Sequence, residues 1–385
     1  RRRAGREAAV VRHFNSWWSE RAPKAAGAIA GDVRRNDGNP AELIPWLATG
    51  HTVSDDAKTW TFTLDPNATF KDGSPVTADA VVYSTQRIID LNQGVAWMFD
   101  GILPRDGVTA VDPQTVQFVL ETPFAPFLHA TTWIFVLNPA EVQANEKDGD
   151  QGQEWLVGNA AGSGPFTIAR WEPGNLYEFK ADPDYWKGWE GPHVDGYIHQ
   201  VSAESSTKRI ALQSGDIQFA DWLSPQDKTV LAKMPDIVVP TDPSITTYTI
   251  KLNNKVGPTS DVNVRRAFSW AFDYDAMIEI MGGFGSRIAG PLSPSIKGAR
   301  QDPFYATDLE KAKEELAKST DYADGFEIDF VYVTGLEEER QTGQIFADQL
   351  SNLNIKVNVV GMEWANAVAL FGDPETSPAM FPIYS

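Results

Sequence analysis

The chain has 385 residues, of which 42% are hydrophobic, and it carries a net charge of -19. This length is enough for two or three domains with cores of their own. A surface this acidic argues against nucleic acid and anionic membranes, because both attract basic patches, and we expect no nucleic-acid partner. The sequence has no cysteine, which excludes disulfides and thiolate chemistry.

The N-terminus differs in composition from the rest of the chain. Its first 40 residues contain nine Lys or Arg residues against four acidic residues. Such a change in charge indicates a tail, a targeting remnant or sequence that does not belong to the fold. We therefore interpret residues 1–42 as an atypical basic N-terminal segment.

Regular patterns begin after residue 43. Residues 59–64 (TWTFTL) alternate between polar and apolar side chains, which predicts a half-buried strand. Asp72-Gly73 then predicts a turn, because glycine accepts a positive φ. Thr77 is expected to cap the following helix with its hydroxyl group, and Val76 and Val81 are spaced as a hydrophobic staple around it.

Strands and helices alternate over the rest of the chain. Further strands are predicted at 115–120, 166–171, 176–180, 197–201, 246–252, 327–333 and 355–360. Further helices are predicted at 206–214, 262–272, 309–318 and 336–353. This order predicts an α/β fold rather than a repeat array.

No motif for enzymatic chemistry is present. The sequence has no phosphate-binding GxxxxGK[ST] loop, no GxSxG and no HExxH. His193 and His199 are not spaced as metal ligands, and the run Glu337-Glu338-Glu339 is interpreted as a solvated helix face. We expect a protein that is not an enzyme and that has no cofactor and no metal.

Several segments together resemble one family. They are LIPWLA at 43–48, SDDAKTWTFTL at 54–64, FKDGSPVTADAVVYS at 70–84, GSGPF at 162–166, DYW at 184–186, VRRAFSWAFD at 264–273 and DLEKAK at 308–313. In this order and spacing they are similar to the bacterial extracellular solute-binding proteins of family 5, which are the peptide- and nickel-type binding components of ABC transporters. The resemblance covers about residues 43 to 365.

The resemblance implies an α/β, periplasmic-binding-protein-like fold of the class II type, with two lobes and an extra inserted domain. It implies that residues 43–50 and 160–250 form lobe I, 51–159 the inserted domain, and 251–385 lobe II. We expect lobe II to be incomplete, because the chain is expected to be truncated at the C-terminus relative to the family.

The implied function is that of an extracytoplasmic solute-binding protein of an ABC importer. It would capture a peptide-like ligand between two hinged lobes and deliver it to the permease subunits in the membrane. An oligosaccharide or another small solute stays open as the ligand, and a hydrolase acting on the same ligands is the alternative from another class. We expect a monomer in the periplasm or another extracytoplasmic space, associated with the membrane through the transporter.

The resemblance also places candidate residues. The candidates for ligand binding are Trp97, Phe99, Trp222, Tyr248 and Trp364. Core packing is the alternative role for each of these aromatic side chains. The candidates for the hinge are Gly164, Pro165 and Asn253.

Overall fold

The computed structural model describes residues 43, 45–189, 191, 193–240, 246–294, 296, 298–371 and 373–384, together with the backbone of 10–15 and 27–28. The rest of the basic segment 1–42 lies outside these residues. The chain divides into two compact units, one ending at Gln200 and the other continuing from Val201 to the C-terminus, which we call unit 1 and unit 2. The division into lobe I, inserted domain and lobe II stays a prediction.

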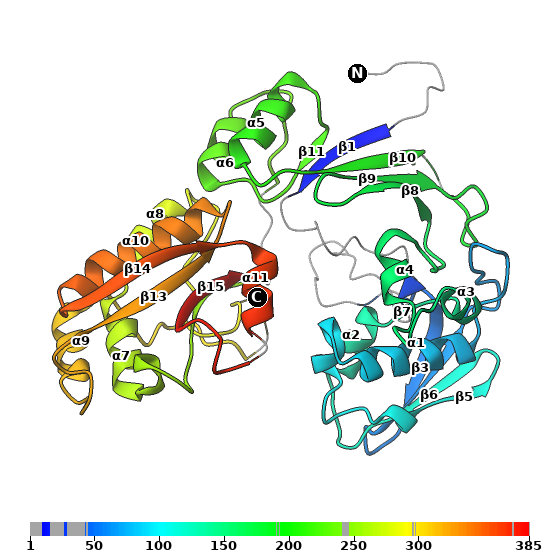
Figure 1. Cartoon of the computed structure of the whole chain (residues 1–385), viewed down its shortest axis with the longest axis horizontal. Coiled ribbons are helices and arrows are strands. Elements are labelled where there is room, and N and C mark those ends of the chain that lie inside the picture. The colour runs from blue at the N-terminus through cyan, green and yellow to red at the C-terminus, as the bar shows by residue number, and fades with distance from the viewer. Residues whose placement is uncertain are drawn as a thin grey trace. The chain divides into compact units, whose positions relative to one another are not determined.

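Unit 1 contains two sheets of its own and the helices around them (Figure 1). Its strands are β2 (Gly27–Ala28), β3 (Ala48–Val53), β4 (Thr59–Leu64), β5 (Val108–Asp112), β6 (Thr115–Val119), β7 (Phe135–Val136), β8 (Phe166–Glu172), β9 (Leu176–Ala181) and β10 (Gly196–Val201), the last ending on the first residue of unit 2. Its helices are α1 (Ala78–Leu91), α2 (Phe127–Ala130), α3 (Pro139–Ala144) and α4 (Gln153–Gly158), with 3-10 turns η1 (Gly94–Met98), η2 (Arg105–Gly107) and η3 (Thr131–Trp133).

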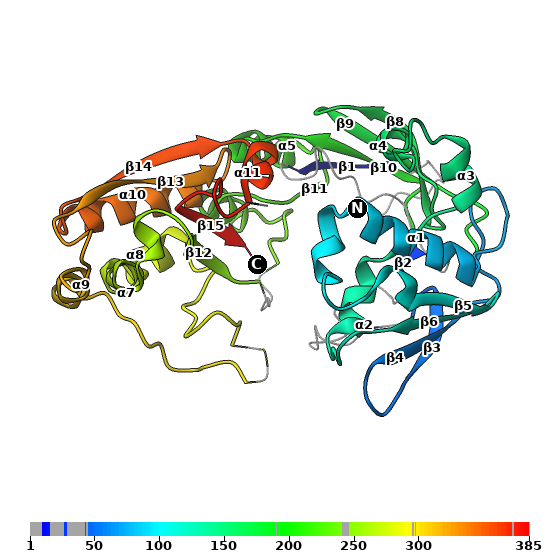
Figure 2. The ribbon, with the colours of Figure 1, turned by 60° about the horizontal axis from the view of Figure 1, so that its bottom comes forward.

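The core of unit 1 follows from the alternating pattern of β4. Strands β3, β4, β6 and β5 form an antiparallel sheet in this order, and Trp60, Phe62 and Leu64 on β4 are buried on one face. Helix α1 runs along β5 and β6 and contributes Val81 to the same core (Figure 2). Strands β8, β9 and β10 pair as a separate antiparallel meander.

The start of α1 confirms one part of its prediction and corrects another. Gly73 has φ +81° in the predicted turn, and Thr77 is the N-cap residue of α1. The Thr77 side chain makes no capping hydrogen bond, so the expected role of its hydroxyl is wrong. The start of α1 is held by core packing, because Val76 and Val81 on either side of Thr77 are both buried. A backbone hydrogen bond from the Ala80 N–H to the Thr77 carbonyl, at 3.0 Å, also stabilises this turn.

Unit 2 is built around one four-stranded sheet in the order β12 (Tyr248–Leu252), β15 (Met380–Tyr384), β13 (Phe326–Val333), β14 (Ile355–Met362). Its helices are α5 (Ser205–Ser214), α6 (Pro225–Leu231), α7 (Val262–Ala271), α8 (Tyr274–Ile280), α9 (Leu309–Leu316), α10 (Glu337–Ser351) and α11 (Trp364–Phe371), with 3-10 turn η4 (Pro258–Ser260). A short strand, β11 (Phe219–Ala220), pairs in parallel with β1 (Val10–Asn15).

The sheet of unit 2 carries its core on one face. Helix α10 runs along β13 and β14 (Figure 1), and its Phe346 packs with Phe330 of β13 and Phe268 of α7. Strands β13 and β14 are parallel, β15 runs parallel to β13, and β12 is antiparallel to β15. The start of β12 and the ends of the other three strands therefore lie at the same edge of the sheet.

Candidate functional site

At the carboxyl edge of the unit 2 sheet, aromatic and polar side chains lie close together. In open α/β sheets, ligands bind outside the carboxyl ends of the strands, where loops and helix starts meet. Tyr384 ends β15, Tyr248 begins β12 directly opposite it, and Glu338 lies in the first turn of α10 after β13. The strand directions thus bring together residues that are far apart in the sequence.

Three aromatic rings meet at this edge. The Tyr248 and Tyr384 ring centroids are 4.9 Å apart, and the Trp222 ring lies edge-on to Tyr384 at 5.4 Å. All three side chains are half-buried, so each keeps part of its surface exposed. We call these three residues the aromatic cluster.

Helix α10 holds the two tyrosine hydroxyls of the cluster. Tyr384 Oη donates to Glu338 Oε1 at 3.0 Å, and Tyr248 Oη donates to Thr342 Oγ1 at 3.0 Å. Burial, followed by the nearby carboxyl groups of α10, raises the pKa of both phenols above the ordinary value. Both tyrosines therefore stay neutral and act as hydrogen-bond donors at neutral pH.

Lys208 fixes the third ring of the cluster. Its side chain is fully buried, and its Nζ donates to the carbonyl oxygens of Asp221 and Trp222, each at 3.0 Å. Trp222 has φ +49°, a left-handed conformation that needs such support in a residue with a side chain. Burial lowers the pKa of Lys208 to about 8, and the carboxylates of Asp221 and Glu338 oppose that change.

The sequence predicted that the acidic run at the start of α10 is a solvated helix face, and this prediction is wrong for two of its three residues. Glu338 is 6% exposed and Glu339 is 1% exposed, while Glu337 is more exposed and pairs with Arg340. Burial raises the pKa of Glu339 to about 8, the negative charge of Glu338 acts in the same direction, and the N–H of Val333, 2.8 Å from Glu339 Oε2, opposes it.

Helical spacing could have revealed one of the two buried acids, Glu338. Glu338, Thr342 and Phe346 follow one another at intervals of four residues, and Phe346 belongs to the core. A run of three acids in the first turn hid that pattern, because acids are also favoured at the positive end of a helix. The sequence reading likewise missed Tyr384 and Lys208, which have no distinguishing local pattern.

The five predicted ligand-binding residues lie in different places. Trp222 and Tyr248 meet at Tyr384 in the aromatic cluster. Trp364 begins α11, and its ring centroid is 6.2 Å from that of Phe371. The Phe371 ring in turn stacks on the Phe381 ring, with centroids 4.2 Å apart. Because side chains alternate along a strand, Phe381 and Tyr384 point to opposite faces of β15, which separates Trp364 from the aromatic cluster.

The other two candidates belong to unit 1. Trp97, in η1, has 70% of its surface exposed, so a ligand could reach it. Phe99 is 1% exposed and packs in the core of unit 1, which favours core packing, the alternative role that the sequence left open.

The hinge candidates each make firm contacts within one unit. The Lys71 ammonium group hydrogen-bonds to the Gly164 carbonyl and pairs with Asp182 at 2.8 Å, and the Pro165 carbonyl accepts the Asp182 N–H at 2.8 Å. The Asn253 N–H donates to the carbonyl of Ala379, which directly precedes β15, at 2.9 Å. Their role as a hinge stays a prediction.

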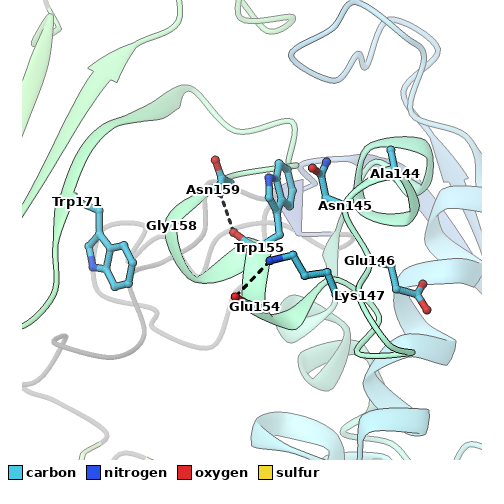
Figure 3. Close-up of a pocket in the computed structure, with 9 residues that line it drawn as sticks. All are labelled: Ala144, Asn145, Glu146, Lys147, Glu154, Trp155, Gly158, Asn159 and Trp171. Carbon is cyan, nitrogen blue, oxygen red and sulfur yellow. Dashed lines mark hydrogen bonds and ion pairs between the residues drawn. The ribbon is translucent and has the colours of Figure 1, made fainter.

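Unit 1 has a pocket of about 490 Å³ on α3, α4 and β8 (Figure 3). Its lining residues are Ala144, Asn145, Glu146, Lys147, Glu154, Trp155, Gly158, Asn159 and Trp171. Polar groups of this lining bind one another: Lys147 pairs with Glu154 at 3.3 Å, and the Asn159 amide donates to the Trp155 carbonyl at 2.8 Å. The indole nitrogen of Trp171 has no partner among the described residues, and Figure 3 shows it on the side of the ring away from Trp155.

This pocket therefore has few polar groups that converge on a ligand, and we take the carboxyl edge of unit 2 as the candidate site. Within the part of the chain that the structure describes, no group of three His, Cys, Asp or Glu side chains is placed to hold a metal. None of the described helices combines the length and the apolar character needed to cross a bilayer.

The fold is that of the periplasmic binding proteins. The periplasmic binding protein DppA from Helicobacter pylori, solved in complex with the peptide STSA, superimposes with a TM-score of 0.83 at 21% identity, over 98% of this chain and 78% of that one. The murein tripeptide binding protein MppA from Escherichia coli gives a TM-score of 0.82 at 23% identity, over 99% of this chain and 80% of that one. The predicted fold class is confirmed.

The family is also confirmed. Residues 42–378 match the bacterial extracellular solute-binding proteins, family 5 Middle, and the chain belongs to this family. The probable D,D-dipeptide-binding periplasmic protein DdpA of Escherichia coli (strain K12) is 36% identical over 71% of this chain and 52% of its own length. The glutathione-binding protein GsiB of Salmonella typhi is 27% identical over 87% of this chain and 65% of its own length. The chain thus spans about half to two thirds of these relatives, which are named as binding proteins and not as enzymes.

Proposed function

We propose that the protein is the extracytoplasmic solute-binding component of an ABC importer and that it captures a peptide-like ligand. The ligand would bind between two hinged lobes, and the closed form would deliver it to the permease subunits. Binding of this kind is a population shift, because a ligand that contacts both lobes only in the closed state stabilises that state.

The observation that carries the proposal is the match to family 5 over residues 42–378. The names of the relatives, a probable D,D-dipeptide-binding protein and glutathione-binding proteins, support a short peptide as the ligand. The carboxyl edge of unit 2 suits such a ligand, because it offers aromatic surface, phenol hydroxyls and a carboxylate close together. An importer of this kind places the protein outside the cytoplasm, next to its permease.

Native mass spectrometry of the purified chain, before and after mild denaturation, tests the ligand class. We expect a bound compound with the mass of a di- or tripeptide, which denaturation releases. Release of an oligosaccharide or another non-peptide solute would overturn the peptide assignment and keep the solute-binding function. Cleavage of an added peptide would instead support the hydrolase.

Binding measurements on variants test the site. Titration with D-alanyl-D-alanine, L-alanyl-L-alanine and glutathione by calorimetry should give saturable binding to at least one of them. The Tyr248→Ala and Trp364→Ala variants should each weaken that binding, whereas Phe99→Ala should mainly lower the melting temperature. Unchanged affinity in both Tyr248→Ala and Trp364→Ala would remove these two residues from the site.

A further inference from the structure

Lys208 is a fully buried lysine whose ammonium group binds the main chain of another segment. Its Nζ donates to the carbonyl oxygens of Asp221 and Trp222, each at 3.0 Å. These hydrogen bonds join α5 to the loop after β11, 13 and 14 residues further along the chain. Burying a charged group is costly unless hydrogen bonds compensate, and here two main-chain carbonyls provide the compensation.

Helix α5 holds the same loop at a second point. Ser205 lies one turn before Lys208, and its Oγ accepts the N–H of Ser224 at 2.8 Å. Main-chain groups at and after Trp222 are therefore bound from one face of α5. Trp222 itself has φ +49°, a conformation that a residue with a side chain adopts only when its surroundings hold it there.

The backbone conformation at Trp222 sets the direction of its ring. The indole lies edge-on to Tyr384 with ring centroids 5.4 Å apart, and the Tyr384 and Tyr248 centroids are 4.9 Å apart. The aromatic cluster thus depends on a left-handed residue whose carbonyl oxygen Lys208 binds. Aromatic side chains that are already fixed in place bind a ligand with a smaller loss of conformational entropy.

We propose that Lys208 is a positioning residue for ligand binding, which holds the main chain at Trp222 so that the indole is ordered beside Tyr384 before the ligand arrives. Because Lys208 is fully buried, a ligand cannot reach it, and it acts only through the residues that it holds. The inference rests on the proposed function, since the effect it assigns to Lys208 is an effect on ligand affinity.

The first measurement follows the Trp222 indole and needs no ligand. Protein labelled with nitrogen-15 at the indole nitrogens gives one NMR signal per tryptophan, and the Trp222 signal is the one missing from Trp222→Gly. Glycine suits this position because it accepts φ +49°. Lys208→Met keeps nearly the length of lysine and lacks the ammonium group, so it should shift or broaden the Trp222 signal. An unchanged Trp222 signal would overturn the proposal.

Arg209→Met is the matched control. Arg209 follows Lys208 in α5 and pairs with Asp227 of α6 at 2.6 Å, so its loss also loosens the contact between these helices. Its side chain donates to Asp227 and Gln213 and not to the main chain at Trp222. The variant should leave the Trp222 signal and the affinity unchanged. An effect equal to that of Lys208→Met would mean that general loosening of α5 is the cause, against the proposal.

The second measurement is a double-mutant cycle on ligand affinity. The probes are D-alanyl-D-alanine, L-alanyl-L-alanine and glutathione, and binding is measured by calorimetry. Lys208→Met and Trp222→Gly should each weaken binding roughly tenfold, the size of one aromatic contact. The double variant should bind no more than roughly twofold more weakly than Trp222→Gly, because Lys208 acts through the ring. Additive losses of roughly 100-fold would show that Lys208 acts independently of Trp222, which refutes the proposal.

The lack of cysteine allows the ammonium group itself to be exchanged. Lys208→Cys carries the only cysteine of the chain, which can be alkylated in urea before refolding. Aminoethylation restores a side chain of lysine length with its ammonium group, and propylation gives the same shape without the charge. The aminoethylated protein should recover most of the wild-type affinity, and the propylated protein should behave like Lys208→Met. Equal affinities of the two would contradict the proposal, and melting curves report the folding of each.

The outcomes separate this inference from the proposed function. If the wild-type protein binds a probe and Lys208→Met binds it equally well, the inference is overturned while peptide binding stands. If the wild-type protein binds none of the probes and mass spectrometry recovers no peptide, the peptide assignment fails and the effect on peptide affinity fails with it. The indole signal then still decides whether Lys208 positions Trp222. Lys208→Gln is the second variant should Lys208→Met not fold; its shorter side chain should give the same change in the signal.

Discussion

The buried carboxyl group of Glu339 makes the stability of unit 2 depend on pH. Its pKa rises from 4.5 to about 8 on folding, chiefly because burial disfavours the charged form. The folded protein therefore binds this proton more tightly than the unfolded chain does. Between these two values the free energy of unfolding must fall as pH rises, because the folded state has to give up a proton that the unfolded state has already lost.

The size of the effect follows from the two pKa values. A difference of one in pKa corresponds to about 1.4 kcal/mol. Integrated from pH 5 to pH 8, the change contributes a loss of roughly 3 kcal/mol in the free energy of unfolding. The stabilising contribution is complete below pH 4.5 and is lost as the pH rises through about 8. A glutamine at this position does not titrate, so Glu339→Gln should lack this loss.

The assay is urea unfolding followed by tryptophan fluorescence at pH 5, 6, 7 and 8, for the wild-type protein and for Glu339→Gln. The other ionisable groups are the same in both proteins, so their contributions cancel when the two curves are subtracted. The variant should gain roughly 3 kcal/mol on the wild type between pH 5 and pH 8. Glu337→Gln is the control: hydrogen bonds from Arg340 lower the pKa of Glu337, and its curve should run parallel to that of the wild type over this range. A constant difference between Glu339→Gln and the wild type across all four pH values would refute the reasoning.

Three further predictions concern stability. Thr77→Ala should lower the free energy of unfolding, measured by thermal unfolding, by less than about 0.5 kcal/mol, because the Thr77 hydroxyl makes no capping hydrogen bond. A loss of stability above about 1 kcal/mol would mean that the hydroxyl does cap α1. Asn138→Ala should lower the free energy of unfolding by about 2 kcal/mol or more, because the buried Asn138 side chain caps α3 and donates to Asp72 at 2.9 Å. An unchanged free energy in urea unfolding would contradict this prediction. Gly343→Ala should destabilise the protein by about 1–3 kcal/mol although alanine favours helices, because a Cβ would lie 2.7 Å from the Phe330 ring; a higher melting temperature would show that the ring can move.

The sequence by itself determined many of the local elements of this protein, although it did not predict others, such as β15 and α11. Every predicted strand and helix from residue 59 onward is present, with ends that differ by no more than two residues. The reason is that periodicity, turn residues and strand alternation are local properties, which a short stretch such as 70–88 carries in its own side chains. The same local patterns, taken in order, were enough to identify the family.

Part of the candidate site could also be found from the sequence. Trp222 and Tyr248 were selected individually, as large aromatic residues beside strand-like runs, and the structure brings both to Tyr384. Phe99 was selected because the family resemblance places aromatic ligand contacts in its segment, and it lies in a core. A large aromatic side chain suits a core as well as a binding site, so the sequence could not separate a site residue from a core residue.

Only the tertiary structure decided which charges are buried and which residues meet. Glu338 and Glu339 read as solvated acids, and they became buried because α10 packs this part of its surface against the sheet. Tyr384 and Tyr248 are 136 positions apart and meet because β12 and β15 are antiparallel neighbours in register. Pairing between distant strands depends on the whole chain, and no short segment encodes it. Many of the local elements could therefore be predicted from the sequence, whereas the group of side chains around Glu338 exists only after the sheet has formed.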